Sequence, residues 1–365
     1  MSRVQAAEFD PELKKFQISE YRLGELQPGE ILIRNRLCTI CGSDLHTFTG
    51  RRAAPQKVNL GHEIIGTVEG WGGDTPPSDY VGDPIRPGDR VTWTMAVGCG
   101  CCFYCEQGLD QKCLQLFKYG HASVSQKPTG GLATHCVLVP GTAVFRLPAA
   151  LPDSVASPAN CATATVTAAL RLVTETHRLK DSKVLILGAG MLGLSAAAQC
   201  KVAAADAIFM ADPNPGRLEL AEAFGVNETF CTQKPSEIAQ KTHRLTDDRG
   251  ADIVLDFAGG NQATEASIEA ARIGGCIVLA GTVFPQPKLG LNMEMLVRRM
   301  LTIRGLHNYR PGDLKVAIDF LTQNHHQFPF LELVEAEYDL ENIEQVFQIA
   351  IEEQPVRLAV RFTDT

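Results

Sequence analysis

Roughly the first 150 residues alternate apolar and polar positions in short runs, a pattern typical of strands with one buried face. These runs lie at 15–19, 30–36, 63–69, 90–94 and 130–148. Turn-forming residues separate them, as at Gln27-Pro28-Gly29, and the Gly-, Pro- and Asp-rich stretch 71–87 predicts a surface loop. The N-terminal part of the chain is therefore predicted to be β-rich.

The pattern then changes to strands that alternate with helices. The small residues of 158–170 predict a buried helix, and helical spacing also occurs at 191–204 and 217–224. Predicted strands lie at 183–187, 207–210, 252–255, 276–280 and 301–305. Strands that alternate with helices indicate βαβ units and a parallel sheet.

Length, composition and charge narrow the class of protein. A chain of 365 residues can form two domains with cores of their own, and 45% hydrophobic and 21% charged residues are ordinary for a soluble globular protein. The net charge of −8 argues against nucleic acid or an anionic membrane as the main partner. The N-terminus lacks a signal-peptide pattern, and the longest apolar run, 184–198, is too short to span a bilayer. We therefore expect a cytoplasmic protein.

The sequence contains twelve cysteines, and four of them have the spacing of metal ligands. They form a C-x2-C-x2-C-x7-C pattern, made by Cys99, Cys102, Cys105 and Cys113. Four thiolates on a tight loop match a closed, tetrahedral structural zinc site. An iron–sulfur cluster and a loop of free thiols are the alternatives. Cys101 does not fit the spacing.

The stretch 38–63 holds a second group of candidate ligands. Cys41 and His62 have side chains that suit zinc, and Asp44 could orient a ligand from the second shell. Ser43 and His46 could pass a proton to water. The alternatives are a buried cysteine beside a core histidine, or a redox pair of Cys38 with Cys41 in a C-x2-C pattern.

A third signal is the sequence Gly188-Ala189-Gly190-Met191-Leu192-Gly193, which follows a predicted strand and opens a predicted helix. Its first glycine permits a tight turn, its second lets a pyrophosphate approach, and its third lets helix and strand pack closely. Asp212 ends the next strand, where a carboxylate would bind ribose hydroxyls and repel a 2′-phosphate, and no basic residue follows before Arg217. The sequence thus predicts NAD rather than NADP; a glycine turn with a capping aspartate is the alternative.

Together these motifs resemble those of the zinc-containing medium-chain dehydrogenases/reductases, which include zinc alcohol, polyol and threonine dehydrogenases. The matching segments are CGSDLH at 41–46, GHEIIGTVEG at 61–70, the cysteine loop at 99–113, PANCATAT at 158–165 and GAGMLG at 188–193. The resemblance implies a mixed α/β protein. A GroES-like β-rich catalytic domain (1–155 and 309–365) would be interrupted by a Rossmann domain with a doubly wound parallel sheet (156–308).

The resemblance also implies roles for individual residues. Cys41, His62 and Cys161 match the ligands of a catalytic zinc. Glu63 matches an acidic residue that lies behind the zinc or replaces water on it. Asp44 matches the carboxylate that orients the ligand histidine.

Other positions match the proton path and the nucleotide site. Ser43 and His46 match a proton relay, and Thr165 matches a threonine beside the nicotinamide. The residues implied to bind the cofactor are Thr165, Gly188, Gly190, Met191, Leu192, Gly193, Asp212 and Arg217.

The implied activity is hydride transfer between NAD and a small secondary alcohol or polyol through a zinc-bound alkoxide, in a homodimer or homotetramer with two zinc ions per chain. The stretches QKCLQLFKYGH, GGLATHCVLVP and PANCATATVTAALR are most similar to an alcohol dehydrogenase subgroup associated with phosphonate catabolism, a similarity that does not rest on any residue that reads a phosphonate. Alternatives are a zinc- and dinucleotide-binding protein without turnover, and a reductase of aldehydes or ketones. The ligand set argues against a zinc-free quinone reductase.

The remaining cysteines and histidines are less specific. Four cysteines in apolar patterns are predicted to be core thiols: Cys136, Cys200, Cys231 and Cys276. His121 and His135 either line the substrate cleft or have a surface or core role. His307 and Asn308 follow the last predicted strand, near where the family places the nicotinamide, and His325 and His326 are predicted to be solvated.

Overall fold

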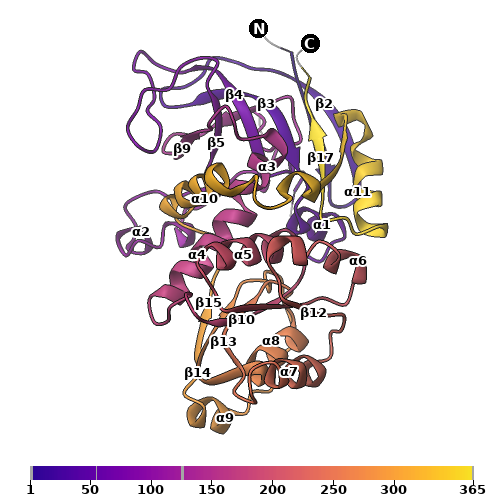
Figure 1. Ribbon diagram of the computed structural model, residues 1–365. Helices are drawn as coiled ribbons and strands as arrows, with labels where there is room; N and C mark the ends of the chain where they lie inside the picture. The colour runs from indigo at the N-terminus through magenta and orange to yellow at the C-terminus, as the bar shows by residue number, and fades with distance from the viewer. Residues whose placement is uncertain (1–2, 55, 125–126, 364–365) are drawn as a thin grey trace. The chain divides into compact units, whose positions relative to one another are not determined.

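Two sheets organise the chain, one in each of two units (Figure 1). The computed structural model describes residues 3–54, 56–124 and 127–363. The first unit comprises Met1–Cys161, Arg310–His325 and Phe330–Thr365, and the second comprises Ala162–Tyr309 and His326–Pro329. The unit boundary follows Cys161 rather than residue 155, so Cys161 belongs with the other residues of the first unit.

The first unit contains the β-rich part of the chain. Its strands are β1 (Arg3–Asp10), β2 (Lys15–Arg22), β3 (Ile31–Thr39), β4 (Glu63–Trp71), β5 (Arg90–Trp93), β6 (Ala96–Val97), β7 (Phe117–Lys118), β8 (His135–Leu138), β9 (Val144–Arg146), β16 (Val334–Tyr338) and β17 (Arg357–Arg361). Its α-helices are α1 (Gly42–Phe48), α2 (Phe103–Glu106), α3 (Asp153–Ala156), α10 (Pro311–Asn324) and α11 (Ile343–Glu352). Short 3₁₀ turns are η1 (Asp110–Lys112), η2 (Ser157–Asn160), η4 (Phe330–Leu333) and η5 (Leu340–Asn342).

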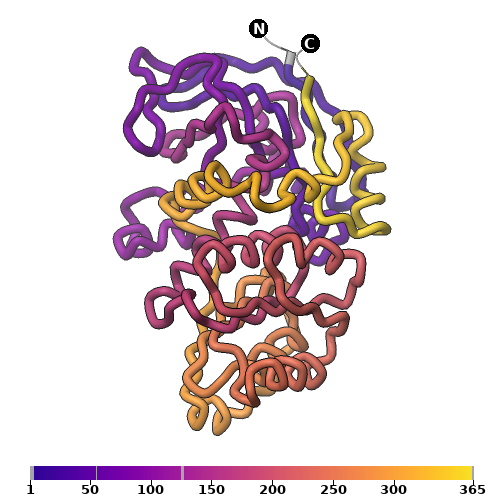
Figure 2. Tube along the Cα trace, viewed as in Figure 1, coloured from indigo at the N-terminus to yellow at the C-terminus, as the bar shows by residue number. Residues whose placement is uncertain are grey.

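The main sheet of this unit has the order β16-β17-β3-β4-β5-β9, and β8 also pairs with β3. Every pair is antiparallel except β16 with β17. Strand β17 pairs with β3 although nearly the whole chain separates them, and Figure 2 shows the yellow C-terminal strand beside the indigo N-terminal ones. The C-terminal segment therefore completes the sheet that the N-terminal segment begins.

The register of β3 on β4 determines which residues meet at one end of this sheet. Thr39 lies opposite Glu63 and Cys38 opposite Ile64. Cys41 follows the end of β3 by two residues, and His62 directly precedes β4. Because antiparallel partners run in opposite directions, the pairing brings these two side chains to the same place. Gly61 occupies the turn into β4 with φ +87, a conformation that favours glycine.

An aromatic cluster fixes the helix that follows Cys41. Phe48 from α1 contacts Phe9 and Phe347, at centroid distances of 5.4 and 5.1 Å, and stacks on Phe16 at 5.8 Å. Aromatic pairs of this kind contribute about 0.5–1.5 kcal/mol each beyond the area they bury. The cluster joins α1 to β1, β2 and α11, so it holds Ser43, which lies on α1, within the first unit.

The second unit is built on a parallel sheet, as predicted from the alternation of strands and helices. Its strands are β10 (Lys183–Leu187), β11 (Ala207–Ala211), β12 (Glu228–Phe230), β13 (Ala251–Asp256), β14 (Ala271–Leu279) and β15 (Thr302–Gly305). Its helices are α4 (Ala162–Thr174), α5 (Met191–Val202), α6 (Pro215–Leu218), α7 (Pro235–Arg244), α8 (Asn261–Ala270) and α9 (Met293–Arg298), with the 3₁₀ turn η3 (Glu222–Phe224).

The strand order β12-β11-β10-β13-β14-β15 is the doubly wound order of dinucleotide-binding folds. The apolar strands β10 and β13 are buried almost throughout, as central strands of a parallel sheet are. Helix α5 packs on β10 and β11, and α8 packs on β13 and β14. Both predicted fold classes, the β-rich one and the Rossmann one, are confirmed.

Three local predictions need correction. The predicted helix at 158–170 begins only at Ala162, because Pro158 lies in the preceding 3₁₀ turn η2. The predicted helix at 217–224 is divided between α6 and η3, where bonds such as Ala221 N–H to Leu218 C=O span three residues instead of four. Cys231 is exposed, because it lies just beyond the end of β12.

The other three cysteines predicted to be core thiols, Cys136, Cys200 and Cys276, are fully buried. No helix in the described part of the chain has the length and apolar character needed to cross a membrane.

Candidate metal centre and nucleotide site

Three predicted ligands converge in the first unit. One ligand atom from each of Cys41, His62 and Cys161 lies within 4.8 Å of the others, and the two sulfurs are 3.9 Å apart. A Zn–S bond of about 2.3 Å gives an S–S edge of about 3.8 Å in a tetrahedron. The sulfur separation therefore fits a shared zinc ion. Cys161 reaches the group from the irregular backbone between η2 and α4.

Asp44 connects the two segments that carry Cys41 and His62. Its buried carboxylate accepts hydrogen bonds from the Cys41 N–H at 3.0 Å and the Gly61 N–H at 3.3 Å. It also lies 3.3 Å from Nδ1 of His62. Burial alone disfavours the imidazolium, but the charge and hydrogen bond of Asp44, together with Cys41, raise the pKa of His62 to about 10. The carboxylate orients the ring from the Nδ1 side, and Nε2, which is 3.4 Å from the Ser43 hydroxyl, is the nitrogen that would bind a metal in place of its proton.

The two ligand sulfurs are electrostatically unequal. The adjacent Cys161 thiol lowers the pKa of Cys41 well below its usual range, and the Arg357 guanidinium, with Nη2 at 3.8 Å from the sulfur, lowers it further. The same contact raises the pKa of Cys161. A pair that shares one proton in this way already holds one thiolate, the form in which cysteine binds a metal.

Glu63 is engaged behind this group rather than in it. Its carboxylate accepts from Arg357 Nε and Nη2, at 2.9 and 3.0 Å, and from the Thr39 hydroxyl at 2.7 Å. All three side chains are buried, and burial raises the pKa of Glu63 to about 7. Of the two roles that the resemblance implies for Glu63, this geometry supports the one behind the metal. Its direct ligation stays a prediction that no contact here supports.

Arg357 and Thr39 were not recognised from the sequence. Arg357 lies in β17, between the apolar Val356 and Leu358, and an arginine with apolar neighbours on both sides is the signal that could have found it. Its partner is nearly 300 residues away, so the sequence alone could not show which carboxylate it binds.

The four-cysteine loop also gathers its sulfurs. The sulfur of Cys102 lies 3.6 Å from that of Cys105 and 3.9 Å from that of Cys113, distances close to the tetrahedral edge given above. The sulfur of Cys113 accepts from the backbone N–H groups of Cys99 and Gln115, at 3.1 and 3.2 Å. Backbone N–H donors, that of Leu114 first, lower the pKa of Cys102 to about 6. Cys101 lies 3.7 Å from Cys99 but outside the group of four.

The glycine turn of the second unit has the geometry that a dinucleotide site needs. Gly188 has φ +98, and a Cβ on Gly193 would lie 1.8 Å from the Gly188 carbonyl oxygen, so both positions require glycine. A Cβ on Gly190 would meet nothing within 4 Å, which leaves the backbone open where a pyrophosphate would lie. Asp212 accepts from the N–H groups of Ala189 and Asn214, both at 2.8 Å, and so ties the turn to the end of β11.

Comparison with known proteins gives the family. The chain matches the family model of the alcohol dehydrogenase GroES-like domain over residues 27–149 and that of the zinc-binding dehydrogenases over 192–323. It is 30% identical to an L-threonine 3-dehydrogenase of Deinococcus radiodurans, over 77% of this chain and 76% of the relative. A sorbitol dehydrogenase of Bacillus subtilis is 25% identical over 93% and 91%. The chain belongs to the zinc-containing medium-chain dehydrogenases/reductases.

The fold agrees with this assignment. An alcohol dehydrogenase structure from Thermotoga maritima aligns with a TM-score of 0.91 and 24% identity, over 99% of this chain and 100% of that one. The predicted family and class of activity are thereby confirmed: the protein is a zinc-dependent oxidoreductase.

The dehydrogenase has further predicted residues whose roles the structure leaves as predictions. Ser43 and His46 lie three residues apart on α1, which places them on one side of the helix. Thr165 lies in α4, Arg217 in α6, and His307 and Asn308 follow β15, all in the second unit.

The candidate histidines behave differently from one another. The His121 ring lies 5.0 Å from the His62 ring, so His121 belongs to the metal centre's surroundings. His135 pairs with Glu69 at 3.2 Å instead. His325 is partly buried, with Nδ1 2.9 Å from the Leu321 carbonyl, and His326 is exposed, so only His326 is as solvated as predicted.

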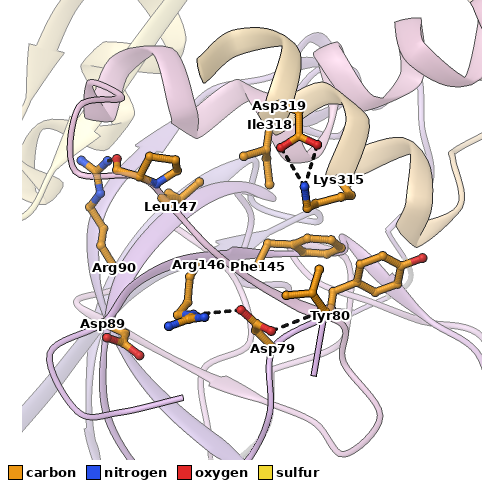
Figure 3. Close-up of a pocket in the computed structure, with 12 residues that line it drawn as sticks. Asp79, Tyr80, Asp89, Arg90, Phe145, Arg146, Leu147, Lys315, Ile318 and Asp319 are labelled. Carbon is orange, nitrogen blue, oxygen red and sulfur yellow. Dashed lines mark hydrogen bonds and ion pairs between the residues drawn. The ribbon is translucent and has the colours of Figure 1, made fainter. Parts of the chain in front are cut away.

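A hollow of about 470 Å³ in the first unit holds none of the predicted site residues. Figure 3 shows two ion pairs among its charged groups, Arg146 with Asp79 and Lys315 with Asp319, at 2.8 and 2.6 Å. The Tyr80 and Phe145 rings lie beside each other at 4.9 Å. The candidate site is therefore the group of Cys41, His62 and Cys161.

The Glu63–Arg357 pair predicts a large loss of stability when only one partner is removed. Arg357→Met leaves a buried carboxylate without its cation, and we expect the free energy of unfolding to fall by about 3–5 kcal/mol. The double variant Glu63→Gln/Arg357→Met should recover much of this loss in denaturant titrations.

The control lies in the same strand. Arg361 pairs with Glu337, but both side chains are about one-third exposed, so Arg361→Met should cost only about 1 kcal/mol or less. Equal losses for Arg357→Met and Arg361→Met would contradict the importance of the buried pair.

Proposed function

We propose that this dehydrogenase oxidises a small secondary alcohol or polyol with NAD, at a catalytic zinc held by Cys41, His62 and Cys161. The convergence of these three ligand atoms, with Asp44 behind the imidazole, carries the proposal. Three protein ligands leave a fourth position for substrate, as catalytic zinc sites do. A second zinc, held by Cys99, Cys102, Cys105 and Cys113, would be structural.

When bound, the zinc would supply a Lewis acid at the alcohol oxygen and NAD would accept the hydride. The chain's own residues handle the proton. The Ser43 hydroxyl lies 3.4 Å from His62 Nε2, at the ligand group, where it can accept the proton of the substrate hydroxyl. Burial, together with nearby Arg51 and Arg52, lowers the pKa of His46, so its imidazole is neutral near pH 7 and can take the proton onward.

Asp212 supports NAD as the dinucleotide. Its carboxylate is buried at the end of β11 and accepts two backbone N–H groups, which hold it at the glycine turn. A 2′-phosphate beside it would meet a like charge without water to screen it. Ribose hydroxyls, in contrast, could donate to its remaining lone pairs.

A cytoplasmic homodimer or homotetramer completes the proposal. All twelve cysteines are unpaired, as is usual in a reducing compartment. A zinc- and dinucleotide-binding protein without turnover is the second candidate. A screen of secondary alcohols and polyols with NAD, followed by NADH absorbance, separates the two, and the reverse assay with aldehydes or ketones gives the preferred direction.

The ligand assignment predicts loss of turnover without loss of cofactor binding. Cys41→Ser or His62→Ala should abolish alcohol oxidation, because each removes a metal ligand, and NADH affinity in fluorescence titrations should change little. Cys231→Ser, an exposed thiol in the second unit, is the control and should retain activity. Near wild-type turnover in either ligand variant would refute the assignment.

The two proposed zinc sites predict distinct metal contents. The purified protein should contain two zinc ions per chain by mass spectrometry, and Cys102→Ser should contain one and melt at a lower temperature. Cys101→Ser should keep both ions, since Cys101 lies outside the group of four. If Cys101→Ser lost zinc and Cys102→Ser did not, the ligand set would have to be redrawn.

The position of Asp212 predicts the cofactor preference. Asp212→Ala should raise the ratio of kcat/KM with NADP to that with NAD by about 10- to 100-fold, because a buried charge and its hydrogen bonds are lost. Asp206→Ala, which removes a more exposed carboxylate of the same unit, is the control. An unchanged ratio in Asp212→Ala would show that another group selects the cofactor.

A further inference from the structure

Positive charge gathers beside the proposed catalytic metal site, and the mechanism above does not use it. Arg52, Lys118 and His121 all belong to the first unit. Arg52 follows α1, where its backbone N–H donates to the His46 carbonyl at 2.9 Å. Lys118 ends β7, and His121 lies in the turn after it, with its N–H on the Lys118 carbonyl at 3.3 Å.

Close packing holds this turn against the ligand segment. Gly120 has φ +72, and a Cβ on it would lie 2.4 Å from the Gly61 carbonyl oxygen and 3.1 Å from Cβ of His62. The backbone of the turn therefore touches the backbone that presents His62. One ring nitrogen of His121 also lies within 4.8 Å of ligand atoms of His62 and Asp44.

His121 connects the metal centre to Arg52. The rings of His62 and His121 lie 5.0 Å apart, and Arg52 Nη1 lies 2.9 Å from Nε2 of His121. Arginine can only donate, so Nε2 is the acceptor in this bond. His121 is thus a positioning residue for the guanidinium.

The cations are not balanced by acids. Among residues 3–54, 56–124 and 127–363, no carboxylate forms an ion pair with Arg52 or Lys118. Burial and the charges of Arg52 and Lys112 lower the pKa of Lys118 to about 8. Two ligand thiolates would balance a divalent metal. The Asp44 carboxylate, bound to the N–H groups of Cys41 and Gly61, is then the one further negative group of this centre in the described part of the chain and does not balance both cations.

We infer that Arg52 and Lys118 bind an oxyanion on the alcohol substrate, so that the substrate is a small hydroxyalkyl phosphonate, phosphate ester or carboxylate. A guanidinium offers paired donors to such a group and an ammonium adds a point charge. The His62 and His121 rings are 5.0 Å apart, and Arg52 is 2.9 Å from His121. These distances allow a small molecule to place its hydroxyl at the metal and its anionic group on the cations. The inference rests on the proposed function and narrows its substrate class.

Four alcohols of similar size test the inference on the zinc-loaded enzyme with NAD. They are 2-hydroxypropylphosphonate, 2-hydroxypropyl phosphate, 3-hydroxybutyrate and neutral butan-2-ol. We expect at least one anionic alcohol to have a kcat/KM about 10- to 100-fold above that of butan-2-ol, as expected for one charge-assisted hydrogen bond. The anionic alcohol with the highest value identifies the oxyanion.

Arg52→Gln should remove this advantage. It should lower the ratio of kcat/KM for the preferred anionic alcohol to that for butan-2-ol by about 10- to 100-fold, mainly through the KM of the anionic alcohol. Lys118→Met should act in the same direction and serves as a second variant if Arg52→Gln folds poorly. Arg52→Lys, which keeps the charge, should retain part of the activity.

The control is Arg51→Gln, which removes an exposed arginine one residue away and changes the net charge equally. Equal losses in Arg51→Gln and Arg52→Gln would reveal only long-range attraction and overturn the inference. A loss that is the same for all four alcohols, with a raised KM for NAD, would assign the cations to the cofactor's pyrophosphate and also overturn it.

Binding separates failure of this inference from failure of the proposed function. Isothermal titration of the zinc-loaded protein with methylphosphonate, inorganic phosphate and acetate needs no turnover. Binding to wild type that is weakened about tenfold or more in Arg52→Gln would support the oxyanion site even if no alcohol were oxidised. If butan-2-ol were oxidised but no anion bound and no anionic alcohol were preferred, the proposed function would stand and the oxyanion site would not.

Discussion

The antiparallel pairing of β3 with β4 is the constraint on which the metal centre depends. It places Thr39 opposite Glu63, so the residues just beyond one strand and just before the other emerge together. Cys41 and His62 meet there because of backbone register, and a slip of one residue would turn their side chains to opposite faces. Asp44 then locks the arrangement by accepting a hydrogen bond from each of the two segments.

Charged side chains of both signs surround Cys41 and His62. The ligand sulfurs and the Asp44 carboxylate are negative, and the Glu63 carboxylate lies behind them. Arg357 donates to Glu63 and approaches the Cys41 sulfur, so one buried cation serves two anions. On another side, Arg52 and Lys118 have no such acidic partner among the residues described. The charges of Glu63, Arg357 and Cys41 are paired with one another, and this pairing stabilises the fold. Arg52 and Lys118 lack such a pairing within the described part of the chain, and this points to an anionic ligand beside them.

Local signals in the sequence were sufficient for much of this architecture. Alternation predicted the β-rich region, the β-then-α rhythm predicted the parallel sheet, and the family motifs located Cys41, His62 and Cys161 within the chain. Each of those motifs consists of residues that are close together in the sequence, so it can be recognised without knowledge of the fold. The glycine turn was equally readable, because Gly188 and Gly193 are required by backbone geometry that any side chain would disturb.

What escaped prediction depends on contacts between distant segments. Arg357 meets Glu63 only because β17 pairs with β3, and no pattern within β17 indicates that partner. Cys231 was misjudged because it is the first residue after a strand end, where a run of apolar neighbours no longer guarantees burial. Arg52 and Lys118 drew no attention as single basic residues; only the fold shows that they lie beside one histidine and near one metal centre.

The place of β17 in the chain also has a consequence for biosynthesis. Cys41, His62 and Cys161 leave the ribosome long before Arg357, which lies 196 positions after Cys161 in the chain. Until β17 docks on β3, the ligand residues can be present while Glu63 lacks its cation, and the interior they share is electrostatically incomplete. Contacts between segments far apart in the sequence form late and slowly. Strand β17 therefore acts as a checkpoint, because the surroundings of the proposed metal centre are complete only after this strand has been synthesised and has docked on β3.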